Sequence, residues 1–143
     1  MKKTNKNYFM QEAIKEASKA YEKNEIPIGA VIVMKNKVIA KSYNQVEKLQ
    51  DSTAHAEILA LTSAFNYTKK KYLKSCTIYV NVEPCIMCLG AIYWSKINFL
   101  VFGIKNKNNK KFKIQNKKIV KKSGILKYDS LKILKDFFKK KRN

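Results

Sequence analysis

The feature that most constrains this chain is its small set of residues that bind transition metals. The 143 residues contain one histidine, His55, and three cysteines, of which Cys85 and Cys88 lie three positions apart. Pro84 precedes Cys85 and suits a first helical turn, because its φ is already helical and its missing N–H would have no partner there. The sequence therefore predicts a helix that begins at Pro84. Both sulfurs would share a face of its first turn, near the positive end of the helix dipole that favours thiolates.

A second helix is predicted around the histidine. Residues 51–53 are Asp, Ser and Thr, whose side-chain oxygens cap helices, and residues 54–61 are strong helix formers. His55 and Glu57 then lie in the first turn, but residues two positions apart on a helix point in different directions. We therefore expect Glu57 to lie beside a metal ion bound by His55, and not among the ligands of that ion.

One imidazole and two thiolates suit zinc, a borderline-soft ion without redox chemistry. Three protein ligands leave one position open, as in catalytic zinc sites, whereas structural sites usually have four ligands. Water in the open position would have its pKa lowered from 15.7 to about 7. Glu57 is then the candidate for proton transfer, because the ligands cannot carry protons while they bind the metal.

Each of these residues also has a simpler interpretation when it is taken alone. The Cys85–Cys88 pair could be a redox pair, and a lone histidine such as His55 could have a structural role. The combination of all three with Glu57 and Pro84 favours a catalytic zinc site. Cys76 is expected to be a small buried residue at the start of a strand.

The two motifs carry a family resemblance. His55-Ala56-Glu57 followed by Pro84-Cys85-Ile86-Met87-Cys88 is the signature of zinc-dependent nucleobase deaminases. Beyond the signature, the chain resembles the bacterial tRNA-specific adenosine deaminases, the TadA family, over almost its whole length. The matching runs are residues 25–33, 53–61, 77–88, 102–103 and, near the end of the chain, 124–138.

The sequence and the resemblance together indicate an α/β protein with a cytidine-deaminase-like, three-layer α/β/α fold. We expect a mixed sheet of about five strands with the zinc helices on one face. Residues 1–143 would form a single deaminase domain that ends in a basic C-terminal helix. The expected elements are a helix over residues 8–21, strands at 30–34, 37–43, 79–82, 97–102 and 119–120, and a last helix from about Tyr128, capped near Asp129.

The resemblance also implies an activity. It is the hydrolytic deamination of adenosine to inosine at the wobble position of a tRNA anticodon stem-loop, in which zinc-bound hydroxide attacks C6 and Glu57 is the proton shuttle. The metal would be one Zn²⁺ per subunit, bound by His55, Cys85 and Cys88, and members of the family are homodimers. Asn44 matches the asparagine that binds the target base in the family, and its amide suits the N7 edge of a purine. A turn asparagine that bonds its own backbone is the alternative.

The chain is strongly basic, with a formal net charge of +21. Such a charge attracts phosphate backbones with little regard to sequence, which fits an RNA partner. However, Arg142 is the only arginine, and a genome biased towards A+T would produce the same lysine excess without selection for binding. Residues 105–118 are almost all lysine and asparagine. They form either a loop along an RNA backbone, with Phe112 stacked on a base, or a solvated loop.

No apolar run approaches the roughly 18 residues that a membrane-spanning helix needs, and residues 1–6 lead into an amphipathic segment. Three cysteines, two of them expected metal ligands, suit a reducing compartment better than a disulfide framework does. We therefore expect a cytoplasmic protein that does not associate with membranes.

Two alternative functions stay open. Residues 89–94 also resemble guanine deaminases, so free guanine or a small nucleotide could be the substrate. Against this, the basic C-terminal helix and Phe137-Phe138 resemble the tRNA-specific branch. The second alternative is a catalytically inactive, zinc-stabilised RNA-binding protein. The presence of Glu57 counts against it, because a purely structural site needs no carboxylate there.

Overall fold

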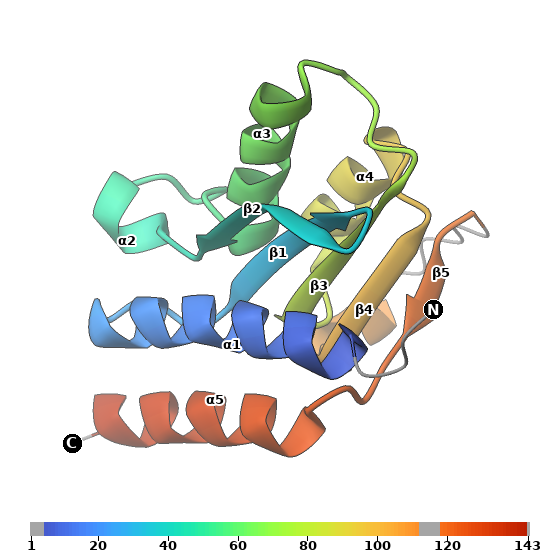
Figure 1. Cartoon of the computed structure of the whole chain (residues 1–143). Coiled ribbons are helices and arrows are strands. Elements are labelled where there is room, and N and C mark those ends of the chain that lie inside the picture. Colours follow the sequence, from blue (N-terminus) through green and yellow to red (C-terminus); the bar gives the residue numbers. More distant parts are fainter. Residues whose placement is uncertain (1–4, 112–117, 143) are drawn as a thin grey trace.

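A five-stranded mixed sheet forms the centre of the protein in the computed structural model, which describes residues 5–111 and 118–142 (Figure 1). In chain order, the strands are β1 (Gly29–Met34), β2 (Lys37–Tyr43), β3 (Cys76–Val82), β4 (Phe99–Ile104) and β5 (Val120–Lys122). Their order across the sheet is β2-β1-β3-β4-β5. β1 is antiparallel to β2 and β3, whereas β3, β4 and β5 run parallel to one another. The predicted mixed sheet of about five strands is confirmed.

Helices cover both faces of the sheet. α1 (Asn5–Glu22) and α5 (Lys127–Lys141) lie side by side on one face, while α3 (Ala56–Thr68) and α4 (Ile86–Trp94) pack on the other (Figure 1). Two short elements complete the described chain, the helix α2 (Val46–Leu49) and the 3₁₀ helix η1 (Lys107–Lys111). The three-layer α/β/α prediction is confirmed, with the helices that follow His55 and Cys85 on the same face.

The two cores follow from the alternation of side chains along buried strands. On β1, Ile32 points into the core beneath α3 and α4, whereas Val31 and Val33 point into the core beneath α1. On β3, Ile78 belongs to the first core and Tyr79 to the second. Central strands that are covered on both faces need apolar residues at nearly every position, which is why these segments read as continuous apolar runs.

The strands expected at residues 30–34 and 37–43 pair as an antiparallel hairpin, with two residues between them. Lys35 and Asn36 have φ angles of 51° and 62°, so both central residues adopt the left-handed conformation of a two-residue type I′ turn. Asparagine tolerates this conformation better than most residues do. The turn therefore forms without the glycine that usually favours it.

Gly29 lies where α1 crosses the start of β1. A Cβ atom at this position would overlap the backbone carbonyl oxygen of Ala13 and the backbone nitrogen of Ala17. The same segment is held from β3 by the fully buried Asn81. Its Oδ1 accepts the Gly29 N–H at 2.9 Å, and its Nδ2 donates to the Pro27 carbonyl oxygen at 2.9 Å. These contacts fix the chain that leads into the central strand.

The predicted helix starts near the metal motifs need correction. α4 begins at Ile86 and not at Pro84, and α3 begins at Ala56, so His55 precedes its first turn. Residues 51–53 do not cap α3. Instead, the Asp51 carboxylate accepts hydrogen bonds from the Thr53 N–H and hydroxyl, both at 2.8 Å, which makes a local turn. This is the competing use of such side chains that sequence propensity does not distinguish.

Three further expectations need a similar comparison. α5 begins at Lys127 after Leu126, whose φ is 52°, so the expected cap near Asp129 is wrong. The sequence predicts no helix between residues 44 and 50, whereas the structure has the short helix α2 there, which needs a tertiary partner described below. The basic loop expected over residues 105–118 begins with η1, while Phe112 lies outside the described residues. Within residues 5–111 and 118–142, no helix has the length and apolarity required to cross a bilayer.

Candidate metal centre and active site

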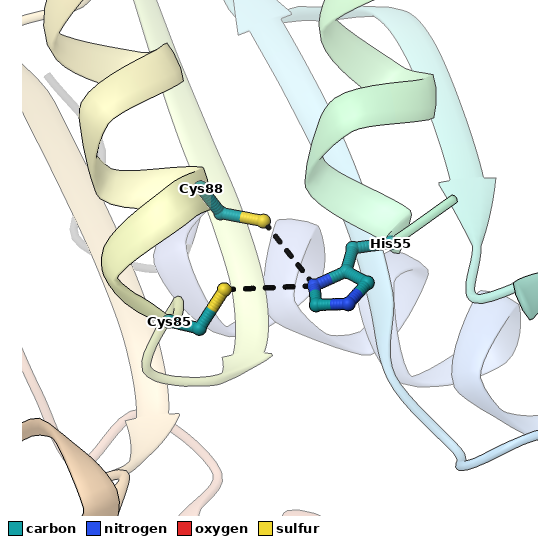
Figure 2. A group of neighbouring side chains, drawn as sticks. All are labelled: His55, Cys85 and Cys88. Carbon is teal, nitrogen blue, oxygen red and sulfur yellow. Dashed lines mark hydrogen bonds between the residues drawn. The ribbon is translucent and has the colours of Figure 1, made fainter. Parts of the chain in front are cut away.

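The N-terminal ends of α3 and α4 bring three candidate metal ligands close together. His55 is the residue before α3, with φ −74° and ψ 153°, and Cys85 is the residue before α4, with φ −69° and ψ 174°. Cys88 lies in the first turn of α4, and its sulfur points towards the same place (Figure 2). The extended residue before a helix directs its side chain back over the first turn, which brings residues 85 and 88 together. The sequence-predicted trio is therefore assembled by two helix N-termini.

The distances between the three side chains fit a tetrahedral zinc site. The Nδ1 atom of His55 lies 3.6 Å from the Cys85 sulfur and 3.5 Å from the Cys88 sulfur, and all three ligand atoms lie within 4.8 Å of one another. Tetrahedral coordination with Zn–S near 2.3 Å and Zn–N near 2.0 Å separates a nitrogen and a sulfur ligand by about 3.6 Å. One nitrogen and two sulfurs at these separations suit zinc in both geometry and ligand chemistry.

A hydrogen bond between the two cysteines shifts their pKa values in opposite directions. The pKa of Cys85 is lowered to about 5, chiefly because its sulfur accepts a hydrogen bond from Cys88. The pKa of Cys88 is raised, because its thiol donates that bond and because it is buried. A metal ion that binds both sulfurs would displace the proton of the Cys88 thiol, as thiolate coordination generally does.

Glu57 lies in the first turn of α3 and is only 4% exposed. Burial raises the pKa of the Glu57 carboxyl to about 7. A carboxyl with such a pKa is present in both protonation states at neutral pH, which is the property that a general acid and base needs. The structure thus places a buried carboxyl in the first turn of α3, in the wall of the cavity that His55 also lines.

Asn44 lies directly after β2 and lines the same cavity as His55 and Glu57, which has a volume of about 710 Å³. The side chain is 5% exposed, and its Nδ2 donates to the Ile26 carbonyl oxygen at 3.3 Å. Within the described part of the chain, the buried Oδ1 atom has no hydrogen-bond partner. Buried polar atoms are nearly always paired, so an acceptor without a protein partner beside a cavity is a candidate contact for a water molecule or a ligand.

Comparison with known proteins agrees with this geometry. The MafB19-like deaminase family matches residues 4–142. The tRNA-specific adenosine deaminase of Buchnera aphidicola subsp. Schizaphis graminum is 41% identical over 150 residues, which cover 99% of both chains. That of Aquifex aeolicus is 39% identical over 146 residues, which cover 96% of this chain and 97% of the relative. The chain belongs to the tRNA-specific adenosine deaminase family.

A solved structure of a family member shows the same fold. It comes from biochemical and structural studies of A-to-I editing by tRNA:A34 deaminases at the wobble position of transfer RNA. The TM-score is 0.83 at 34% sequence identity, and the match covers 89% of this chain and 99% of the other. The expected resemblance to this family is confirmed over nearly all of the chain.

The end of α5 contributes to the cavity wall, a position that the sequence did not predict for it. Phe137, Phe138 and Lys141, at the end of α5, form part of this wall, together with Lys23 after α1. α5 reaches the cavity because it runs beside α1 on the sheet face opposite α3 and α4 (Figure 1). The terminal Phe137-Phe138 pair, which resembles the family, was the only sequence signal for this contact.

The second missed contribution is Glu25, a carboxylate only 2% exposed that holds α2 in place. Its two oxygens accept the backbone N–H groups of Glu47 and Lys48, at 3.0 and 2.8 Å. These N–H groups lie in the first turn of α2 and have no partner within the helix, which explains how so short a helix forms. An acidic residue four positions before an apolar strand, in a chain rich in lysine, could have drawn attention to this position.

Proposed function

We propose that this protein hydrolyses the 6-amino group of the adenosine at the wobble position of a tRNA anticodon, so that inosine and ammonia are formed. The observation that carries the proposal is the convergence of His55, Cys85 and Cys88 beside the buried Glu57, in a cavity that also contains Asn44. The sequence motifs predicted the same activity. The membership of this chain in the tRNA-specific adenosine deaminase family supports the same substrate.

The site would hold one zinc ion per subunit. His55 Nδ1 and the sulfurs of Cys85 and Cys88 are the proposed ligands, and their separations suit it. Zinc bound there would lower the pKa of the attacking water and polarise it for addition to C6 of the adenine. Side chains of this protein would carry out the proton transfers and bind the base.

Glu57 is the proposed proton shuttle. Its carboxylate accepts a proton from the attacking water and passes it to N1 of the adenine as the C6–O bond forms. It then takes the proton of the new C6 hydroxyl and passes it to the departing 6-amino group, so that the C6–N bond breaks, the C6 carbonyl of inosine forms and ammonia leaves. The near-neutral pKa of Glu57, which results from its burial, supports both directions of transfer.

Asn44 is the proposed base-binding residue. An amide that faces the N6/N7 edge of adenine donates to N7 and accepts from the 6-amino group. The unpaired Oδ1 of Asn44 provides the acceptor, and the Nδ2 group, held by the Ile26 carbonyl oxygen, has a second N–H for N7. Guanine presents two acceptors at the same edge, so this arrangement favours adenine.

We also propose that the enzyme is a homodimer whose interface includes α4. The helix contains no charged residue although the chain has a net charge of +21. Ile86 and Trp94, eight positions apart and so on one stripe of the helix, are 38% and 72% exposed. Gly90 lies between them and faces open space. An uncharged, exposed stripe on so basic a chain fits a second copy of itself better than it fits water.

The cytoplasm, where tRNA is modified, is the compartment that this substrate requires, and residues 1–143 are proposed to act as one deaminase domain. The direct test is to incubate the purified protein with an anticodon stem-loop, free adenosine and free guanine, and to measure ammonia and inosine. We expect inosine at the wobble position of the stem-loop. Ammonia from guanine alone would favour the guanine deaminase alternative, and no product from any substrate would favour the inactive RNA-binding alternative.

A further inference from the structure

Glu83 is the only acidic residue between Ile58 and Tyr128, a stretch rich in lysine. It stands at the end of β3, two residues before Cys85. Its carboxylate Oε1 accepts a hydrogen bond from the Asn106 backbone N–H at 3.0 Å. A surface carboxylate among lysines would be expected to pair with an ammonium group. Here its partner is a backbone N–H of the segment that follows β4.

Further contacts fasten the same two stretches of chain together. The Glu83 N–H donates to the Ile104 carbonyl oxygen at 2.8 Å, which continues the parallel pairing of β3 with β4. The Asn106 Nδ2 approaches the Glu83 carbonyl oxygen at 3.5 Å, and the Asn109 Nδ2 donates to the Pro84 carbonyl oxygen at 2.8 Å. Residues 83–84 are therefore bound to residues 104–109 at several points, directly before the proposed ligand Cys85.

The segment of residues 105–109 is ordered around Asn106. The Asn106 Oδ1 accepts the Asn108 N–H at 3.0 Å, and its carbonyl oxygen accepts the Asn109 N–H at 3.1 Å, which starts η1. Lys105 and Lys107 remain exposed. The Glu83 contact thus fixes a backbone whose lysine side chains point into solvent, on the cysteine side of the metal centre.

We propose that Glu83 is a positioning residue for the RNA substrate. Its carboxylate holds the 105–109 segment so that Lys105 and Lys107 meet the phosphates of the RNA whose adenosine enters the cavity. The inference rests on the proposed function, because it assigns the segment to the same RNA. It assigns Glu83 no contact with the base or the metal, since its hydrogen bonds lead away from the cavity and towards the segment.

The test compares Glu83→Ala with Glu83→Gln, because a glutamine retains the oxygen that accepts the Asn106 N–H. Both variants remove one negative charge, and Glu12→Ala, on α1, removes a charge on the opposite face of the sheet. KM and kcat for an anticodon stem-loop and the zinc content are measured for each. We expect Glu83→Ala to raise KM about tenfold, the cost of one hydrogen bond to a charged group. Its kcat and zinc content should stay unchanged, with Glu83→Gln and Glu12→Ala near wild type.

Charge alone predicts the opposite pattern, because loss of a carboxylate should strengthen RNA binding in all three variants equally. That result would overturn the inference. Loss of zinc and of kcat in Glu83→Ala would overturn it as well, because Glu83 would then act through Cys85. Fluorescence anisotropy with the same stem-loop separates this inference from the proposed function. Weaker binding by Glu83→Ala supports the inference even if the wild type converts no RNA, an outcome that would overturn only the deaminase proposal.

Discussion

His55 and Cys85 occupy equivalent positions on two helices, because each is the extended residue immediately before the first turn. Their side chains meet at 3.6 Å although 30 positions separate them in the sequence. The positive ends of both helix dipoles therefore face the proposed metal centre, where they stabilise thiolates and other anions. The proposed chemistry depends on this convergence of the two helix N-termini.

Replacement of Glu57 by glutamine should remove the proton shuttle and leave the metal site intact. We expect the rate of inosine formation to fall by at least about 10²- to 10⁴-fold, the range that general acid and base catalysis supplies. Glu12→Gln, in α1 on the opposite face of the sheet, is the matched control and should retain full activity. Ammonia release and metal analysis on the same samples provide the measurement. Full turnover by Glu57→Gln would remove Glu57 from the mechanism.

Replacement of Asn44 by alanine should weaken recognition of adenine. A bidentate amide contact to a base contributes about 1–3 kcal/mol, so we expect kcat/KM for the stem-loop to fall by roughly tenfold or more. Asn98→Ala removes an exposed asparagine outside the cavity and is the control. Equal kcat/KM values for the two variants would show that Asn44 does not bind the base and has only a structural role in the turn.

Replacement of Trp94 by glutamate should disrupt the proposed dimer. A stable interface buries about 800 Å² on each partner, and a charge placed on an apolar stripe opposes such burial. Tyr128 is 79% exposed on α5, so Tyr128→Glu is a control of similar size and exposure. We expect light scattering to give a dimer mass for the wild type and for Tyr128→Glu, and a monomer mass for Trp94→Glu. A monomeric wild type at all concentrations would contradict the interface.

Two glycines offer a matched test of the packing between α1 and the sheet. Gly29→Ala introduces a Cβ that overlaps the backbone of α1 at Ala13 and Ala17, so we expect the free energy of unfolding to fall by about 1–3 kcal/mol or more. Gly90 has nothing near its missing Cβ and lies within α4, so Gly90→Ala should be neutral or stabilising by up to about 1 kcal/mol. Urea unfolding of both variants checks the difference. Equal stabilities would show that α1 adjusts without cost.

The sequence was sufficient for much of the fold because its strongest signals are local. Alternation and β-branched runs predicted the strands around residues 30–34 and 37–43, and the turn at Lys35-Asn36 followed from their spacing. The helix starts were displaced by one or two residues because Pro84 is compatible with several positions near a helix N-terminus. The structure shows that the extended residues are the metal-binding candidates themselves.

The remaining features could not be predicted from local sequence patterns, because they depend on contacts between residues that are distant in the sequence. α2 forms when Glu25 accepts its first N–H groups, and neither the four residues of α2 nor Glu25 indicates this alone. The cavity wall from α5 likewise depends on how α5 packs beside α1. Single-domain organisation and the roles of the individual site residues stay predictions until they are tested.

The most direct measurement of the central claim is the zinc content of the purified protein and of three variants, His55→Ala, Cys85→Ala and Cys88→Ala. Thermal unfolding of each variant verifies that it is folded. We predict one zinc ion per chain in the wild type and close to none in each variant, with inosine formation lost in parallel. A folded variant that retains a full complement of zinc would contradict the assignment of His55, Cys85 and Cys88 as the ligands.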